Sequence, residues 1–414
     1  MKICIHRGSK QIGGTCIELE AQGKRLVLDL GLPLDAETSG VEHLPPVSGL
    51  LEPDESLMGV VISHPHQDHY GLARHLHPDL PVLIGEAANR ILKAAADFVP
   101  NGFAFENPIS LHHLKPIPLG PFTITPYLVD HSAFDAYALL IEADGKRLFY
   151  SGDFRAHGRK SQLFDHFIAH PPQEIDVLMM EGSTISRDGT EFGFPTETDL
   201  EKVFEDEFNT TEGLALVMAS SQNIDRIVSV FRAFNKTGRT LIIDLYLAAV
   251  LAATGGKKIP QSDWPQVSVF IPHRQRIQIK EKELFDVLAP HRAQRIYPQH
   301  LKELAPKAAM IFRPYMGVDL KRADCLSGAR LFYSLWDGYL NDGSQDYLLE
   351  WLTRHDIPLT KIHTSGHASV ADLKRFAQAL APKRLVPIHS FEPGRYPELF
   401  NNVEPHTDGE WWEV

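Results

Sequence analysis

The residues best suited to chemistry are four ligand-type side chains that follow one apolar run. Residues 60–63 predict a buried strand, and after it come His64, His66, Asp68 and His69. Neutral imidazoles and a carboxylate are ligands that suit zinc, manganese or iron. A turn after the strand can arrange them around two metal ions. A histidine-rich surface loop is the alternative, but an apolar strand seldom leads by chance into so dense a ligand cluster.

Each ion of a catalytic two-metal site needs about four or five donors, so further ligands must come from other segments. His131 and Asp153 follow predicted strands over 122–129 and 147–151, at positions where the loops of a sheet converge. Taken alone, either residue would more often be a buried structural or capping residue. A carboxylate such as Asp153 could bridge both ions. Asp29, at the end of another predicted strand, is better placed to accept the second N–H of a metal-bound histidine.

The predicted elements change in character along the chain. Residues 1–195 contain short strands, turns and a few helices, which favours a layered α/β design. Residues 196–345 alternate helices and strands as a parallel α/β unit does, with a loop region expected at 255–272. Residues 346–414 add a helix and an apolar strand over 384–388. The chain is therefore expected to have three sequence segments, 1–195, 196–345 and 346–414.

Composition limits the class of protein. The 414 residues are 43% hydrophobic and carry a net charge of −12, which predicts a folded, enzyme-sized protein. This charge is opposite to that of many nucleic-acid binders, so a polyanion would have to meet a local basic patch. Cys4, Cys16 and Cys325 suggest neither a disulfide framework nor a thiolate metal site. Neither a signal peptide nor a membrane span is indicated, and we expect a cytoplasmic protein.

Several of these motifs together resemble a known superfamily. The opening at 12–16, Asp29, the cluster at 64–69, His131 and Asp153 resemble the metallo-β-lactamase superfamily. The resemblance implies an α/β fold, an αββα sandwich with metals at one edge of its paired sheets.

Later motifs narrow the resemblance to the β-CASP branch, which processes nucleic acids. Glu181 resembles the acidic motif after which that branch carries an inserted domain, and the segments 363–368 and 386–389 are similar to its second and third motifs. Ribonuclease J relatives have closely similar motifs. The segments 220–226 and 313–316 resemble elements of the inserted domain less tightly.

The resemblance implies a metallo-β-lactamase domain in two parts, 1–195 and 346–414, with a parallel α/β β-CASP domain inserted at 196–345. Two features depart from ribonuclease J. The sequence ends soon after the third motif, so an extra C-terminal domain is not expected, and the loop 131–137 is spaced differently. The first departure leaves homodimer formation open, and the second weakens the transfer of substrate detail.

The resemblance also implies roles for the candidate ligands. His64, His66 and His131 would hold one divalent ion, and Asp68, His69 and His389 a second, with Asp153 shared and Asp29 accepting the second N–H of one of the metal-bound histidines. Zinc is the expected metal and manganese the alternative. A hydroxide between the two ions would attack phosphorus in RNA or single-stranded DNA.

Other residues would act on the leaving group and the substrate. His367 would stabilise or protonate the leaving oxygen, and Glu181 would either orient His367 or hydrogen-bond elsewhere within the site. Arg155, two residues after Asp153, would bring a cation close to the metals. The remaining substrate-binding candidates are His363, Ser365 and Ser221. His363 is equally compatible with a structural role, and Ser221 with part of an ordinary helix N-terminus.

The predicted function is a metal-dependent nuclease, and two alternatives remain. A small-molecule hydrolase acting on an ester, thioester or lactam would share the metals but have no use for the stretch from about 190 to 345. A nucleic-acid-binding subunit with a dead site would be expected to have lost ligands, and none is missing here. The sequence leaves open RNA or DNA, endonuclease or exonuclease and its direction, the native metal, and the pathway.

Overall fold

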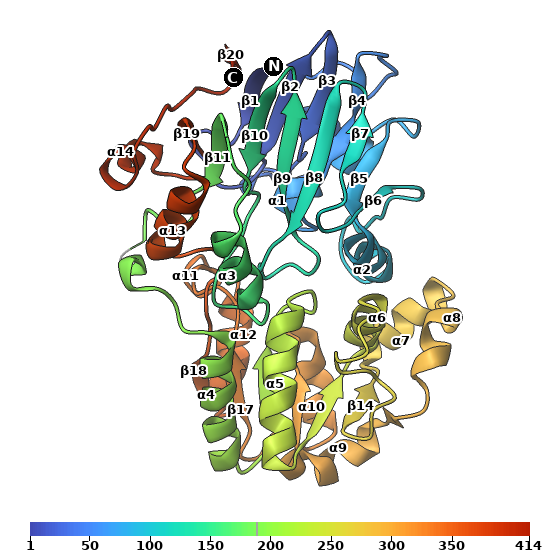
Figure 1. Cartoon of the computed structure of the whole chain (residues 1–414). Coiled ribbons are helices and arrows are strands. Elements are labelled where there is room, and N and C mark those ends of the chain that lie inside the picture. The colour runs from blue at the N-terminus through green and yellow to red at the C-terminus, as the bar shows by residue number, and fades with distance from the viewer. Residues whose placement is uncertain (188) are drawn as a thin grey trace. The chain divides into compact units, whose positions relative to one another are not determined.

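The computed structural model describes residues 1–187 and 189–414, and the chain divides into two compact units (Figure 1). The first unit contains residues 1–96, 100–194 and 366–414, and the second contains 97–99 and 195–365. No helix in the described ranges has the length and apolar character of a membrane span.

Two sheets form the middle of the first unit. In spatial order, the first sheet contains β20 (Trp411–Glu413), β1 (Lys2–Arg7), β2 (Cys16–Ala21), β3 (Lys24–Leu28), β4 (Leu57–Val61), β5 (Val82–Gly85) and β6 (Ile109–Leu111). The second contains β19 (Arg384–Ile388), β11 (Val177–Glu181), β10 (Lys146–Tyr150), β9 (Tyr137–Ala143), β8 (Phe122–Leu128) and β7 (Ile117–Leu119).

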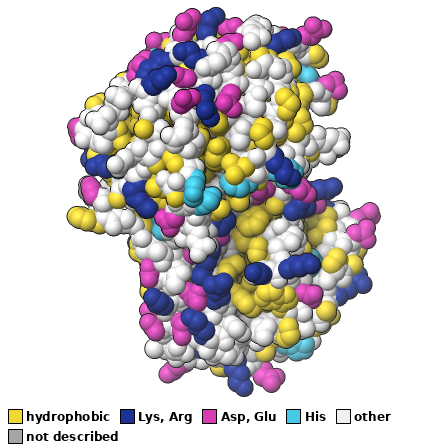
Figure 2. Space-filling view, viewed as in Figure 1, with side chains coloured by type: hydrophobic (Ala, Val, Ile, Leu, Met, Phe, Trp, Pro, Cys, Tyr) yellow, Lys and Arg dark blue, Asp and Glu magenta, His cyan; other side chains and the backbone are white. Residues whose placement is uncertain are grey.

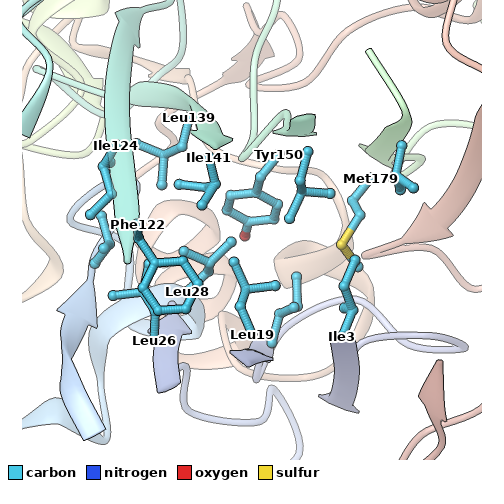
Figure 3. Packing of buried hydrophobic residues seen from close by; sticks show 14 of the residues in the cluster. Ile3, Leu19, Leu26, Leu28, Phe122, Ile124, Leu139, Ile141, Tyr150 and Met179 are labelled. Carbon is cyan, nitrogen blue, oxygen red and sulfur yellow. The ribbon is translucent and has the colours of Figure 1, made fainter. Parts of the chain in front are cut away.

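The two sheets pack face to face because alternate residues on their strands are apolar. Leu26 and Leu28 of β3 lie in one buried cluster with Phe122 of β8 and with Leu139 and Ile141 of β9 (Figure 3). Successive side chains of a strand point to opposite faces, so the residues between them serve the outer faces of the sheets.

Helices cover those outer faces. Helix α2 (Glu86–Ala96) packs Ala88 and Leu92 against the first sheet, while α3 (Ser161–Ala169) and α13 (Val370–Leu380) cover the second. The short helices α1 (Gln67–Tyr70) and α14 (Tyr396–Leu399) complete the unit. This order of layers confirms the predicted α/β fold class, an αββα sandwich.

The second unit has a parallel sheet. Its strands, in spatial order, are β15 (Arg295–Ile296), β14 (Val267–Phe270), β13 (Thr240–Ile243), β16 (Ala308–Ile311), β12 (Ala215–Met218), β17 (Arg330–Tyr333) and β18 (Leu359–Lys361). Its helices are α4 (Glu197–Thr210), α5 (Ile224–Thr237), α6 (Leu245–Ala253), α7 (His273–Glu281), α8 (Phe285–Leu288), α9 (Pro298–Leu304), α10 (Gly317–Arg322), α11 (Gly338–Asn341) and α12 (Asp346–Arg354).

Two sequence predictions about this unit need correction. The expected boundary at 345 lies 20 residues before the last residue of the unit, Ser365. The reason is that β18 pairs with β17, while Leu348 and Trp351 of α12 are buried in the core of the unit. The loop expected over 255–272 contains β14, a short strand paired on both sides.

A ring cluster holds α13 against the second sheet and so supports the loops at its edge. Phe376 of α13 is 1% exposed, with its ring centroid 4.3 Å from that of Phe154 and 4.8 Å from that of Phe167. We expect Phe376→Ala to lower the free energy of unfolding by about 3–5 kcal/mol, because it removes these contacts and leaves a cavity. Urea denaturation measures the change. Phe192→Ala, at a ring 94% exposed, should change stability by less than about 0.5 kcal/mol, and an equal loss in both variants would contradict the prediction.

Candidate metal centre

The candidate ligands lie at the carboxyl ends of strands of the first unit. His64 follows β4, His131 follows β8, Asp153 follows β10 and His389 follows β19. Strands β10, β11 and β19 run parallel, so the residues that follow them reach the same edge of their sheet. Residues that are far apart in the sequence are therefore brought together in space.

Among the described residues, ligand-type atoms form three groups, in each of which they lie within 4.8 Å of one another, and the third of these contains Asp153, Glu181 and His367. The first group contains His64, His66 and His131, and the second contains Asp68, His69, Asp153 and His389. The Asp153 Oδ2 atom lies 3.2 Å from His69 Nε2, 3.6 Å from His389 Nε2 and 3.7 Å from His64 Nε2. One carboxylate thus lies beside histidines of the first and second groups, as a bridging ligand must.

The bonding of these atoms fits divalent cations. The Nε2 atoms of His64, His69 and His389 and both carboxylate oxygens of Asp153 are buried and make no hydrogen bond within the described ranges. Buried polar atoms are normally hydrogen-bonded, so five such atoms at one point indicate an electron-pair acceptor. Imidazole and carboxylate donors suit zinc and manganese.

The charge states of the three histidines in the first group agree with this use. Burial, together with the neighbouring imidazoles His69 and His131, holds the pKa of His64 well below its usual range. Burial likewise lowers the pKa of His66 to about 4 and that of His131 well below its usual value. These rings are neutral near pH 7 and keep a lone pair for a cation.

Asp29 fixes the orientation of His69. Its carboxylate accepts hydrogen bonds from the Ser63 backbone N–H at 2.7 Å, from the Ser63 hydroxyl at 2.8 Å and from His69 Nδ1 at 2.8 Å. The Tyr150 hydroxyl donates to the same carboxylate. Because Nδ1 carries the proton, His69 presents Nε2 to the group around Asp153.

Sequence reasoning missed several supporting residues. Ser63 and Tyr150 hold Asp29, and Thr15 Oγ1 lies 2.9 Å from His389 Nδ1. Each stands in or next to a motif already singled out, which is the signal that could have found it. Gly31 has a different role: a Cβ there would lie 1.8 Å from the Asp68 carbonyl oxygen, so only glycine allows this approach.

Glu181 and His367 lie beside the second group. The Glu181 carboxylate accepts from the Phe154 backbone N–H at 3.0 Å, from the Ser183 hydroxyl at 2.8 Å and from His367 Nδ1 at 3.0 Å. Burial opposes a charge on His367, but the Glu181 and Asp153 carboxylates raise its pKa above the usual value. His367 can therefore carry a proton near neutral pH.

Arg155 does not occupy the substrate-binding position expected from its place in the sequence. Its side chain is fully buried, and Nε lies 3.2 Å from Asp130 Oδ1. Asp130 also accepts from the Gly158 backbone N–H at 2.7 Å. Adjacency to Asp153 indicated a nearby cation, but burial and pairing make Arg155 a support for the loop instead.

The other three substrate-binding candidates belong to the second unit. Ser221 is buried, and its hydroxyl accepts a hydrogen bond from Arg313. Ser365 is buried as well. Burial, followed by the charge of Arg226, lowers the pKa of His363 to about 4, so this ring is neutral near pH 7.

The sequence of the chain is similar to those of known proteins. Residues 34–200 match the model of the β-lactamase superfamily domain. Over 409 residues the chain is 22% identical to ribonuclease J of Helicobacter pylori, which covers 94% of this chain and 56% of the relative. Ribonuclease J of Sinorhizobium meliloti is 26% identical over 227 residues, 53% of this chain and 39% of the relative. The chain thus spans about half the length, or less, of these curated relatives.

A solved structure shares the fold over nearly all of both chains. It is a protein of unknown function from Enterococcus faecalis, with a TM-score of 0.79, 22% sequence identity and 99% of each chain covered. The domain match and the ribonuclease J relatives confirm the resemblance to the ribonuclease J-like, β-CASP branch of the metallo-β-lactamase superfamily.

The Arg155–Asp130 pair gives a stability prediction. Asp130→Asn should lower the free energy of unfolding by about 3–5 kcal/mol, because it removes the negative charge from a fully buried ion pair. Denaturant titration measures the loss. As a control, Asp165→Asn breaks the exposed pair between Arg375 and Asp165 and should cost less than about 1 kcal/mol. Similar values for the two variants would show that burial does not decide the effect.

Proposed function

We propose that the chain is a metal-dependent phosphodiesterase that hydrolyses RNA or single-stranded nucleic acid at the His/Asp cluster. The observation that carries the proposal is the Asp153 carboxylate, which lies within 3.7 Å of three histidine Nε2 atoms that make no hydrogen bond among the described residues. The relatives named ribonuclease J support nucleic acid as the substrate class.

In this proposal two divalent cations bind at the first and second groups. His64, His66 and His131 would hold one, Asp68, His69 and His389 the other, and Asp153 would touch both. Bound there, such cations supply an activated water and neutralise the charge that develops on phosphoryl oxygens. Zinc is the proposed metal and manganese the alternative.

The chain's own residues would manage orientation and proton transfer. Asp29 accepts the Nδ1–H of His69 and so keeps Nε2 directed at the ligand group. Glu181 does the same for His367, whose Nε2 would then give a proton to the leaving oxygen of the sugar. In this scheme Glu181 is a positioning residue, since its oxygens are already committed to Phe154, Ser183 and His367.

The second unit supports a long substrate over a small one. In the proposal it is the β-CASP domain and supplies binding surface for a nucleic-acid strand, with Ser221, His363 and Ser365 as candidates for contact. A homodimer remains open, and a cytoplasmic location stays a prediction from the sequence.

The first test removes ligands of the second group. The double variant Asp68→Ala, His69→Ala should lose at least one of about two bound metal ions and at least about a hundredfold in cleavage of labelled single-stranded RNA. Metal content is read by mass spectrometry, and cleavage on gels. His170→Ala, an exposed histidine of the same unit, is the matched control.

Unchanged cleavage in the double variant would contradict the proposal and indicate a contaminating nuclease. Turnover of a chromogenic ester or lactam without cleavage of RNA would replace it with a small-molecule hydrolase. Freshly purified protein without bound metal, which also fails to cleave when metal is added, would indicate an inactive binding subunit.

The second test concerns pH. The Glu181 carboxylate raises the pKa of His367, and activity that needs protonated His367 falls as pH rises through that value. Glu181→Gln should therefore move the alkaline limb of the kcat/KM profile to lower pH by about one unit or more. Metal content should stay at the wild-type level, which separates this effect from loss of metal. An unmoved alkaline limb would remove His367 from the proposed role.

A further inference from the structure

A second candidate binding site lies in the second unit, away from every residue given a role above. A pocket of about 360 Å³ is bounded by α7, α8 and the edge strand β15. This volume is at the lower end of the range of small-molecule sites. The pocket therefore has room for one compact group and not for a folded segment.

One part of the lining is apolar. Ile271, Ile279 and Leu288 are buried, while Phe285 is 49% exposed. A half-exposed phenylalanine over buried aliphatic residues offers a flat apolar surface, on which an aromatic ring can stack.

The other part of the lining is cationic and incompletely bonded. Arg276, Lys280 and Arg295 line the pocket, and none of the described residues that line it carries a carboxylate. The Nε atoms of Arg276 and Arg295 are buried without a hydrogen-bond partner in the described part of the chain. Asp319 lies 3.4 Å from a terminal nitrogen of Arg276, and the Arg295 guanidinium lies over the Tyr297 ring. Two buried N–H groups of this kind favour an anionic acceptor.

The surrounding segment has the matching charge. Residues 273–295 contain six Lys or Arg and three acids, in a chain whose net charge is −12. Figure 2 shows Lys and Arg side chains beside hydrophobic ones over this part of the second unit. This segment is the local basic patch that a polyanion would need on an acidic protein.

We propose that this pocket binds a nucleoside phosphate, with its base against Phe285 and its phosphate on Arg276 and Arg295. A nucleotide complements both parts of the lining. Its base is a flat ring for the apolar part, and its phosphate is an oxyanion that guanidinium groups bind through paired hydrogen bonds. Its source is either a free mononucleotide or one nucleotide of a strand. The second source rests on the proposed function.

The experiment measures the binding of AMP to the full chain by calorimetry. Arg295→Gln and Phe285→Ala should each raise the Kd for AMP about tenfold or more, because each removes one of the two contacts. Arg292→Gln removes the same charge from an exposed residue of the same segment that does not line the pocket, and should change the Kd by less than about twofold. Circular dichroism checks that each variant is folded.

Further arms locate the ligand and its source. AMP should still bind the Asp68→Ala, His69→Ala variant, and loss there would place AMP at the metal centre and overturn the inference. Binding of decanoate in place of AMP, or equal Kd values in all variants, would overturn it too. If a strand is the source, a short oligoadenylate binds more tightly than AMP and is weakened by Arg295→Gln. If the ligand is a free mononucleotide, the short oligoadenylate binds no more tightly than AMP.

The outcome is independent of the proposed function. Cleavage of RNA without binding of AMP refutes the pocket and leaves the nuclease in place. Binding of AMP that depends on Arg295, in a protein that does not cleave RNA, supports the pocket and refutes the nuclease.

Discussion

A single carboxylate buried among imidazoles sets the constraint that the rest of the first unit meets. Asp153 has both oxygens buried without a hydrogen bond within the described ranges, and ring nitrogens of His69, His389, His64 and His367 lie 3.2–3.7 Å from its Oδ2 atom. A buried carboxylate without a partner raises the free energy of the folded state. Buried histidine ring nitrogens that bind neither a proton nor a cation raise it as well. The surrounding fold must therefore hold several rings at fixed angles, and Asp29 and Thr15 do this from behind.

The sandwich supplies that rigidity because the cluster draws on both sheets. His64 and Asp29 follow strands of the first sheet, whereas Asp153, Glu181 and His389 belong to strands of the second or follow them. The Tyr150 hydroxyl joins the two, since it comes from β10 and donates to Asp29 after β3. The core between the sheets thus stabilises the fold and also positions the residues of the His/Asp cluster.

The structure brings together the ligand-type residues that the sequence singled out, because they stand in short motifs that follow apolar runs and these runs form strands. Their role as metal ligands stays a prediction. Tyr150 and Thr15 stand in or next to motifs that the sequence singled out, but the sequence did not pair them with Asp29 and His389, which are distant along the chain. Arg155 was misjudged because a charge next to a ligand says nothing of its burial. The boundary at 345 was wrong because α12 and β18 look alike in sequence whichever sheet they join.

The position of β19 has a consequence for how the protein is made. His389 follows β19, which pairs with β11 some two hundred residues earlier, and residues 195–365 of the second unit are synthesised between the two strands. A nascent chain that already contains the residues from His64 to Asp153 still lacks His389. This residue becomes available only when the last tenth of the chain has left the ribosome. The late pairing of this strand delays completion of the cluster until nearly all of these residues have been synthesised.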